Sequence, residues 1–417
     1  MVELDKEAAE ILDRISSLLE NASAYSKGKK MKAGWERKKL GDLLEIQNGF
    51  AFDSKSFSDS GEMPLIRIRD LKKGIDTEIR YTGEFDEKYI VNAGDLLVGM
   101  DGEFRCYEWK GKQALLNQRV CRLQKFKDSL FDRFVFYGIN KYLKDIEEST
   151  GFTTVKHLSS KKISDINFPI PPLSEQRRIV AILDEAFAGI AAAKEKAEQN
   201  LKNAKEVFES YLESVFTPRG ADWKELTLKE ISSDFGRGKS KHRPRNDKKL
   251  YGGDYPFIQT GDIRSANHLI IDYSQTYNET GLAQSKLWPK GTICITIAAN
   301  IAETAILNFD ACFPDSVIGI VVNDNKADSD YVEFLLQAFK VKIQAMSKGS
   351  AQENINLGTF ENKLFPFPTV YKQKKIVERL TYLHQETSSL ESSYQQKIYD
   401  LEELKKSVLQ QAFSGAL

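Results

Sequence analysis

The sequence is poor in the residues and motifs that mark secreted, membrane-bound or metal-dependent proteins. Its four cysteines, Cys106, Cys121, Cys294 and Cys312, form no CxxC pair, and no histidine lies at metal-ligand spacing from them. No uncharged stretch approaches the roughly 20 residues that cross a bilayer. The N-terminus has acidic residues among its apolar positions, unlike a signal peptide. We therefore expect reduced, mostly buried thiols in a cytoplasmic protein with neither a metal nor another cofactor of its own.

Catalytic motifs are also missing. Only four histidines occur, with no HExxH and no GxSxG, and we expect them in loop contacts and on a helix surface. The stretch GRGKS resembles the end of a phosphate-binding loop, but Ser233 replaces the glycine required five places before Gly238, and Pro244 follows where a helix should start. INFPIPPLSEQ has Ile170 and Leu173 where an amino-methyltransferase signature needs an amide and an aromatic residue. The sequence therefore favours a non-enzyme, with methyl transfer by this chain as the enzymatic alternative.

Overall charge is balanced, and the composition is that of a folded protein. Sixty basic residues offset 60 acidic ones, so the chain has no net field that would attract a polyanion, which argues mildly against nucleic-acid binding. Eleven prolines and 26 glycines in 417 residues are too few for a disordered or fibrous protein. At this length we expect two or three folded domains.

An internal duplication is the most informative feature of the sequence. Six landmarks recur in the same order at a period of roughly 190 residues, which suits two copies of a whole domain. Alternating apolar strands and Gly-led turns are common to both copies. The paired landmarks are WERKKLGDLLEI and WKELTLKEISSD, PLIRIRDLKKG and PFIQTGDIRSA, AGDLLVGMDG and KGTICITIAA, LLNQRVCRL and FPDSVIGIV, STGFTT and SKGSAQ, and NFPIPPLSEQRRIV and LFPFPTVYKQKKIV.

After each copy the apolar period changes from two to about three and a half, which predicts two long helices. Helices of about 40 residues reach about 60 Å and cannot be buried by one small domain, so we expect the two to pack on each other, antiparallel. A dimerisation zipper between chains is the alternative. The apolar positions are Ile179, Leu183, Ala186, Ile190, Ala193, Ala197, Leu201, Ala204, Phe208, Leu212 and Val215, then Ile376, Leu380, Leu383, Leu390, Tyr394, Ile398, Leu401, Leu404 and Val408.

These patterns predict an α+β fold in which two similar globular domains, each a mixed β-sheet with short helices, are joined by a pseudo-two-fold coiled coil of two long antiparallel helices. A short N-terminal helix docks near the bundle. The predicted segments are residues 1–34 (N-terminal helix and Lys/Gly-rich linker), 35–171 (first domain), 172–218 (central long helix), 219–368 (second domain) and 369–417 (C-terminal long helix).

Two divergent domains, each followed by a long helix, resemble the specificity subunits of Type I restriction-modification systems. Domains of this family often open with Trp-x-x-x-x-Leu-x-(Asp/Glu), as at Trp35–Asp42 and approximately at Trp223–Glu230. They often exit through Pro-x-Pro-(Pro)-x-x-(Glu)-Gln, as at Pro169–Gln176 and in weaker form at Pro366–Gln373. The second exit departs from this phrase because Lys372 stands where the Glu should be. The resemblance covers essentially the whole chain.

The resemblance implies a non-catalytic subunit that recognises an asymmetric, two-part target in double-stranded DNA. Each globular domain would be a target-recognition domain for one half. The paired helices would set the gap and dock two modification (methyltransferase) subunits, with restriction (endonuclease and translocase) subunits as further partners. S-adenosylmethionine, ATP and Mg²⁺ would then be used by those partners. A scaffold that bridges proteins without reading DNA is an alternative, and salt-sensitive binding to duplex DNA would distinguish the two.

Candidate DNA-binding residues in the second copy gather in a basic stretch between Ile231 and Lys249, which glycines and Pro244 should keep as an exposed loop along phosphates. A solvated loop without a ligand is the alternative. A second, Gly-led loop carries amides that can pair with adenine. The candidates are Arg237, Lys239, Lys241, His242, Arg243, Arg245, Arg264, Lys348, Ser350, Gln352 and Asn354.

In the first copy, Arg67 and Arg69 alternate along a predicted strand and so share one face, with Lys72 and Lys73 at its end. Arginine can read guanine, although pairing with nearby acids is an equal alternative. Amides follow at an early turn and after an apolar strand, where turn capping explains them as well as base reading does. The remaining candidates are Gln47, Asn48, Asn117, Gln118, Arg119, Thr153, Thr154 and Lys156.

Overall fold

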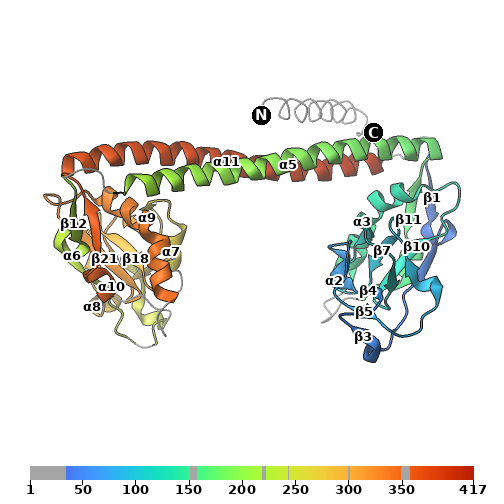
Figure 1. Ribbon diagram of the computed structural model, residues 1–417, viewed down its shortest axis with the longest axis horizontal. Coiled ribbons are helices and arrows are strands. Elements are labelled where there is room, and N and C mark those ends of the chain that lie inside the picture. Colours follow the sequence, from blue (N-terminus) through green and yellow to red (C-terminus); the bar gives the residue numbers. More distant parts are fainter. Residues whose placement is uncertain (1–33, 151–156, 218–221, 243, 299–300, 349–356) are drawn as a thin grey trace. The chain divides into compact units, whose positions relative to one another are not determined.

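The structure, a computed structural model, describes residues 34–150, 157–217, 222–242, 244–298, 301–348 and 357–417. The chain divides into two compact units. Unit 1 extends to Ala197 and includes Gln396–Leu417, whereas unit 2 is Glu198–Gln395. Each unit contains a globular module and parts of two long helices, α5 (Leu173–Val215) and α11 (Val370–Ser414) (Figure 1). The predicted N-terminal helix and linker lie outside the described residues.

Module 1, the described part of residues 34–170, contains three sheets. Their strand orders are β1-β11, β2-β10-β7-β8 and β3-β5-β4-β9-β6. The strands are β1 (Glu36–Lys39), β2 (Glu45–Asn48), β3 (Phe57–Ser58), β4 (Met63–Ile66), β5 (Arg80–Tyr81), β6 (Ile90–Val91), β7 (Leu96–Gly99), β8 (Cys106–Glu108), β9 (Ala114–Leu116), β10 (Val120–Gln124) and β11 (Asn167–Ile170). The helices are η1 (Leu40–Asp42), η2 (Ser54–Ser56), α2 (Ile68–Leu71), η3 (Glu87–Tyr89), α3 (Asp132–Ser149) and α4 (Ser160–Ser164).

Module 2, the described part of residues 222–367, is built in the same way. Its sheets have the orders β12-β22, β13-β21-β18-β19-β15 and β16-β14-β20-β17. The strands are β12 (Lys224–Thr227), β13 (Ser232–Arg237), β14 (Tyr251–Phe257), β15 (Leu269–Ile270), β16 (Gln275–Tyr277), β17 (Leu287–Trp288), β18 (Ile293–Thr296), β19 (Thr304–Leu307), β20 (Ala311–Cys312), β21 (Val317–Val322) and β22 (Leu364–Phe367). The helices are α6 (Leu228–Ile231), η4 (Lys248–Leu250), α7 (Thr260–Ser265), α8 (Glu279–Ala283), α9 (Ser329–Lys348) and α10 (Leu357–Glu361).

Strand pairing confirms the duplication read from the sequence. The order β2-β10-β7-β8 of module 1 recurs as β13-β21-β18-β19 in module 2. A parallel pair also recurs between corresponding strands, β4 with β9 in module 1 and β14 with β20 in module 2. The opening and exit strands pair antiparallel in both, β1 with β11 and β12 with β22. The predicted α+β class, with mixed sheets and short helices, is therefore confirmed.

In each module an amphipathic helix, α3 or α9, packs on the main sheet and against a long helix. One core joins Phe134 and Val135 of α3 with Val98 of β7 and Ile179 of α5. Gly138 of α3 allows close packing, because a Cβ there would lie only 2.3 Å from Phe413 of α11 and 2.6 Å from Phe168. The cores thus extend from the sheets to the helix bundle.

The long helices pack on each other within both units. In unit 1, Ile190 and Ala193 of α5 share a buried cluster with Leu401 of α11. In unit 2, Leu212 of α5 and Leu380 of α11 belong to one core. Partners move backwards along α11 as α5 advances: Ala186 shares a core with Val408 and Lys194 pairs with Glu402 in unit 1, and Lys205 pairs with Glu391 and Phe208 contacts His384 in unit 2. This confirms antiparallel pairing of two segments of one chain. The pseudo-two-fold relation of the units stays a prediction.

One predicted position of the helix interface is wrong. Leu390 is 47% exposed, whereas Thr387, three residues earlier, is buried. Thr387 fits because its hydroxyl donates to the Leu383 carbonyl oxygen (2.9 Å), which satisfies the polar group within the helix. Apolar spacing therefore assigned Leu390 to the interface wrongly and missed the buried polar residue Thr387.

The structure also answers the predictions on thiols and membranes. Cys106, Cys121, Cys294 and Cys312 are free and buried, and burial raises the pKa of the thiols. Within the described ranges, no helix combines the length and apolar character needed to cross a bilayer.

Candidate nucleic-acid interface

The basic stretch of module 2 is only partly a loop. Residues up to Arg237 form strand β13, which pairs antiparallel with β21, so the prediction of a continuous loop from Ile231 is wrong. The first part of the stretch is thus a strand, although its charged residues and glycines suggested a loop. Gly238, in the GRGKS stretch, is buried, and a Cβ at this position would lie 2.3 Å from the Phe313 carbonyl oxygen. This glycine is thus explained by packing.

Beyond β13 the chain is exposed and its cations divide into two groups. Arg245 Nη2 lies 2.6 Å from Asp315 Oδ1, and Arg237 Nε donates to the Asp315 backbone oxygen (2.7 Å). Lys239, Lys241 and Lys248 are exposed, and within the described residues no ion pair engages them. These three lysines are therefore available to phosphates, whereas the two arginines are partly committed to Asp315.

His242 belongs to the turn that holds this loop. Its Nε2 lies 2.9 Å from Asp247 Oδ2, and its backbone N–H donates to Gln284 Oε1 (3.0 Å). Hydrogen bonds from the Lys249 backbone N–H and then from His242 lower the pKa of Asp247. His242 accordingly shapes the loop, and its predicted contact with DNA stays untested.

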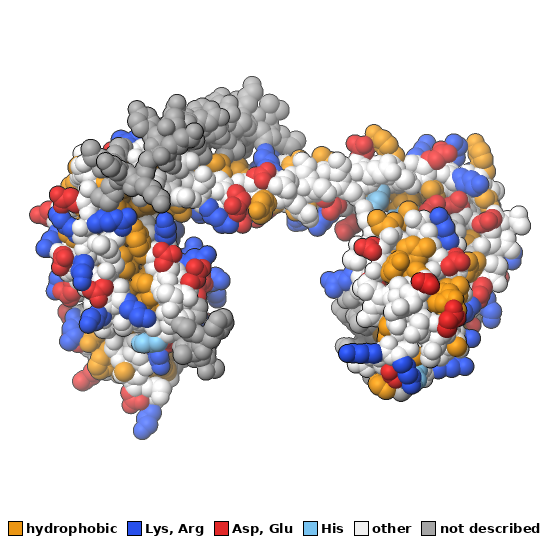
Figure 2. All heavy atoms as spheres, turned by 180° about the vertical axis from the view of Figure 1, so that it is seen from behind, with side chains coloured by type: hydrophobic (Ala, Val, Ile, Leu, Met, Phe, Trp, Pro, Cys, Tyr) orange, Lys and Arg blue, Asp and Glu red, His pale blue; other side chains and the backbone are white. Residues whose placement is uncertain are grey.

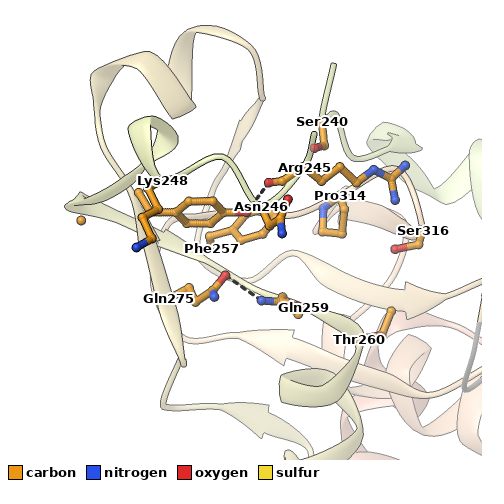
Figure 3. Close-up of a pocket in the computed structure, with 12 residues that line it drawn as sticks. Ser240, Arg245, Asn246, Lys248, Phe257, Gln259, Thr260, Gln275, Pro314 and Ser316 are labelled. Carbon is orange, nitrogen blue, oxygen red and sulfur yellow. Dashed lines mark hydrogen bonds between the residues drawn. The ribbon is translucent and has the colours of Figure 1, made fainter. Parts of the chain in front are cut away.

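A hollow of about 680 Å³ lies beside the basic loop (Figure 3). Its apolar floor includes buried Phe257 and half-buried Tyr251, while Arg245 and Lys248 carry charge to its rim. Tyr251 Oη donates to the Arg245 carbonyl oxygen (2.7 Å), which fixes the loop against the hollow. The Arg245 guanidinium extends toward Ser316, and Lys248 lies on the opposite side (Figure 3).

Two glutamines face each other at the edge of this hollow (Figure 3). Gln259 Nε2 donates to Gln275 Oε1 (2.7 Å). Gln259 immediately precedes α7, and its backbone N–H donates to Asp262 Oδ2 (2.8 Å). Gln275 lies in β16 opposite Phe257 of β14. Our sequence reasoning missed both amides, although Gln259 lies in the duplicated landmark PFIQTGD.

The corresponding junction of module 1 corrects the prediction for Arg67 and Arg69. The strand β4 ends at Ile66, and Arg69 lies in helix α2, so the two arginines do not share a strand face. The helix starts here because the Arg67 backbone N–H donates to Asp70 Oδ2 (2.9 Å). Arg67 Nε also lies 3.4 Å from that carboxylate. Arg69 is exposed on α2.

Lys72 and Lys73 follow α2 directly and are exposed in a turn, so the predicted end of a strand is instead the end of a helix. Arg264, exposed on α7, occupies the related helix of module 2. Both short helices thus present cations at the surface of their module.

The early amides of module 1 lie on a strand rather than at the predicted turn. Gln47 and Asn48 belong to β2, which pairs with β10. Gln47 Oε1 accepts hydrogen bonds from Arg122 Nη2 (2.6 Å) and Nε (3.1 Å), and its amide donates to the Lys88 carbonyl oxygen (2.8 Å). Asn48 Nδ2 makes a long contact of 3.4 Å with Ser160 Oγ. Gln47 therefore has a structural role that its sequence neighbours did not reveal.

Asn117, Gln118 and Arg119 follow the apolar strand β9, as predicted, and connect it to β10. Asn117 is buried, and its Oδ1 accepts from the Gln118 backbone N–H (2.7 Å). Arg119 Nη1 lies 2.6 Å from Asp101 Oδ2, and His157 Nδ1 lies 2.6 Å from the other oxygen of the same carboxylate. Turn capping accounts for Asn117, while Gln118 and Arg119 remain exposed candidates.

Several candidates lie at the end of a described segment or outside the described residues. Lys348 is the last residue of α9, so it ends a helix rather than opening a loop. The others lie outside the described residues: Thr153, Thr154, Lys156, Arg243, Ser350, Gln352 and Asn354.

A buried glutamine joins each module to the long helix that follows it. Gln176, the fourth residue of α5, donates to the Pro171 (2.8 Å) and Ser129 (2.9 Å) carbonyl oxygens and accepts from the Phe131 N–H (2.8 Å). Gln373, the fourth residue of α11, donates to the Pro368 carbonyl oxygen (2.9 Å) and accepts from the Asp328 N–H (2.9 Å). These amides explain why both exit phrases end in Gln.

The exits differ at the residue before this glutamine. Glu175 holds Arg178 of the same helix (2.7 Å), whereas Lys372 pairs with Asp222 of module 2 (2.7 Å). In unit 2, Lys372, Lys375 and Arg379 line a hollow of about 550 Å³ with residues near the end of α5. The two exits therefore present different charges.

Charge is finely mixed over both modules. Figure 2 shows Lys, Arg, Asp and Glu side chains interspersed on the visible face of each. Among the described residues, no group of three or more His, Cys, Asp or Glu side chains could hold a metal ion. The candidate interface is therefore a set of local amides and cations.

Comparison with known proteins identifies the family. The family described as "Type I restriction modification DNA specificity domain" matches the chain twice, at residues 32–203 and 220–399. The EcoBI specificity subunit of Escherichia coli is 29% identical, covering 92% of this chain and 86% of that protein. The MjaVIII specificity subunit of Methanocaldococcus jannaschii is 25% identical, covering 85% and 87%.

Solved structures share the fold. A chain from a study of complex assembly and conformational transition of the type I R-M system has a TM-score of 0.72 at 18% identity, covering 94% of this chain and all of that one. The HsdS subunit of Thermoanaerobacter tengcongensis has a TM-score of 0.58 at 17% identity, covering 94% and 99%. With two modules of one topology, two paired helices and two family matches, the chain belongs to the Type I restriction modification DNA specificity domain family.

Proposed function

We propose that this chain is the DNA-recognition subunit of a cytoplasmic Type I restriction-modification complex, and that it recognises an asymmetric, two-part target in double-stranded DNA. The observation that best supports this proposal is that two modules share one topology but carry different side chains on their surfaces. Where Arg67 precedes α2 in module 1, Gln259 precedes α7 in module 2. Two modules with different readers should select two different half-sites.

The chain itself is proposed to be non-catalytic. Methyl transfer and cleavage, with S-adenosylmethionine, ATP and Mg²⁺, are assigned to modification and restriction subunits. The paired α5 and α11 helices are the proposed docking site for two modification subunits, because they extend beyond the module cores and expose polar faces. The EcoBI and MjaVIII relatives are named specificity subunits of Type I restriction enzymes, which supports a recognition role for this chain.

Exchange of module 1 tests the proposal. Residues 35–168 are replaced by the equivalent segment of a relative with a different target, and methylated motifs are mapped across the genome of the source cell. We expect a split adenine-methylated motif that disappears on deletion of the gene and changes in one half only after the exchange. A change in both halves contradicts modular reading.

A second measurement separates DNA recognition from scaffolding. The complex of the chain with co-expressed modification subunits is titrated with duplex DNA at increasing salt. Phosphate contacts predict that binding weakens steeply as salt rises. Absence of salt-sensitive binding would favour a protein that only bridges partners.

A further inference from the structure

The amide pair at the edge of the module 2 hollow offers a defined hydrogen-bonding pattern. One glutamine donates to the other across 2.7 Å. Whichever amide donates, the pair retains one carbonyl oxygen that can accept and one NH₂ group that can donate. Gln275 is exposed, and within the described part of the chain its side chain makes no hydrogen bond other than the one to Gln259. The pair is thus pre-oriented and open to a ligand.

This pattern matches one base in the major groove. Adenine presents a donor, N6–H, beside an acceptor, N7. Guanine presents only acceptors at O6 and N7, cytosine a donor at N4, and thymine an acceptor at O4 next to a methyl group. A paired donor and acceptor therefore complement adenine with two hydrogen bonds and each other base with fewer.

The surroundings of the pair suit a nucleic-acid edge. The floor of the hollow contains buried Phe257, which stacks on Tyr277 with ring centroids 4.0 Å apart. This stack holds β14 and β16 together and so fixes the strand that carries Gln275. Lys248 lies at the rim without an ion pair among the described residues, where it can meet a phosphate. Two amides on a rigid floor can contact a base edge, while the cation at the rim can position a phosphate.

Module 1 differs at the same place. Pro64 of β4 lies opposite Arg80 of β5, as Pro256 of β14 lies opposite Thr276 of β16. By this register Gln259 corresponds to Arg67 and Gln275 to Ile79, so the amide pair belongs to module 2 alone. An arginine and an isoleucine at these two positions supply donors only, which complements guanine rather than adenine.

We propose that Gln259 and Gln275 together read one adenine, through N6 and N7, in the half-site recognised by module 2. This inference rests on the proposed function. The strand–helix junction is then the position at which the two modules acquire different base preferences.

The test compares the base preference of variants in the complex with co-expressed modification subunits. Binding is measured to duplexes in which each position of the wild-type motif is varied in turn. Gln275→Leu and Gln259→Leu should each reduce discrimination at one adenine of the module 2 half-site by about tenfold to a hundredfold. The module 1 half-site should keep its discrimination. Gln396→Leu, a change at an exposed glutamine of α11, serves as the matched control and should leave the motif unchanged.

Isosteric variants keep the inference testable if the leucine variants fail to assemble. Gln275→Glu makes the pair richer in acceptors, so preference should shift from adenine toward cytosine, whose N4 donates. A wild-type motif retained by both Gln275→Glu and Gln259→Glu overturns the inference, as does a change confined to the module 1 half-site. A wild-type complex with no two-part motif would instead refute the proposed function, so the two failures are distinguishable.

Discussion

The two modules are most alike where they meet the long helices and least alike at the strand–helix junctions. Gln176 and Gln373 make the same type of buried hydrogen bonds. Phe134 and Tyr331, each the third residue of its helix, both contact an aromatic residue at the end of a long helix. At the junctions Arg67 corresponds to Gln259. The difference teaches that the two modules share their buried contacts to the long helices, while the side chains at their strand–helix junctions differ.

The aromatic contacts at the ends of the two long helices are the first feature to test. Phe216, after the end of α5, packs on Tyr331 in unit 2, whereas Phe413, near the end of α11, packs on Phe134 in unit 1, with ring centroids 5.2 and 4.8 Å apart. Phe216 is 3% exposed and Phe413 is partly exposed. Phe216→Ala should lower the unfolding free energy of unit 2 by about 3–5 kcal/mol, and Phe413→Ala should affect unit 1 less.

Hydrogen exchange of the α9 and α3 amides measures the two units separately. Each substitution should accelerate exchange in its own unit. An equal loss of protection in both units after either substitution would mean that these aromatic contacts do not stabilise their own units separately.

The buried glutamines are the second feature. Gln176→Leu removes three hydrogen bonds and leaves the Phe131 N–H and two carbonyl oxygens without partners. We expect a loss of roughly 2–3 kcal/mol in unfolding free energy, and a similar but smaller loss for Gln373→Leu. Gln199→Leu, at an exposed glutamine of α5, is the matched control and should change stability by less than about 0.5 kcal/mol. Denaturant unfolding checks all three, and a neutral Gln176→Leu would refute the buried role.

Ionic networks at equivalent helix positions should respond differently to pH. In unit 1, Arg133 of α3 contacts Asp184 and Glu108, and hydrogen bonding to Asp184 raises the pKa of this guanidinium further. In unit 2, His268 lies between Asp330 (2.9 Å) and Glu333 (2.7 Å) of α9 and stacks on Phe334. Burial lowers the pKa of His268, but the hydrogen bonds to Asp330 and Glu333 outweigh it and raise the pKa from 6.5 to about 9.

A histidine with a raised pKa stabilises the fold while it is protonated. Its contribution is fully present below about pH 6.5 and is lost as the pH rises through about 9. We expect unit 2 to lose on the order of 2 kcal/mol across this window while unit 1 stays constant. His268→Asn should remove the pH dependence and tolerate the left-handed backbone at this position (φ 72°). Hydrogen exchange at pH 6 and 9 gives the measurement, and equal pH responses of the two units would contradict it.

Features with a local period or a repeated phrase could be predicted from the sequence. The strands of both modules, the duplication and the two long helices follow from alternation of apolar residues and from landmarks such as Pro64 and Pro256. The two exit glutamines stand out in the sequence because the same residue recurs at the same place in both copies. Their structural role could not be predicted, because their partners Phe131 and Asp328 each lie 45 residues earlier in the chain.

Prediction failed where a side chain's partner is set by folding. Arg67 alternates with Arg69 as in a strand, yet the Asp70 carboxylate caps the backbone and starts α2. His268 gains two carboxylates that are 62 and 65 residues away, and Gln259 meets Gln275 only through the pairing of β14 with β16. For these sites the sequence shows which chemical group is present, but only the folded structure shows which residue it contacts.

The smallest expected effect concerns ion pairs between the paired helices. Lys194 Nζ lies 2.6 Å from Glu402 Oε1 in unit 1, whereas Lys205 Nζ lies 4.0 Å from Glu391 Oε2 in unit 2. Because the four side chains are partly solvated, Lys194→Met should cost about 0.5 kcal/mol or less and Lys205→Met still less. Salt should screen the first pair, so the difference between the two variants should vanish near 1 M NaCl. Thermal unfolding at low and high salt measures this, and a loss above about 1 kcal/mol at high salt would show that Lys194 stabilises the bundle by packing rather than by charge.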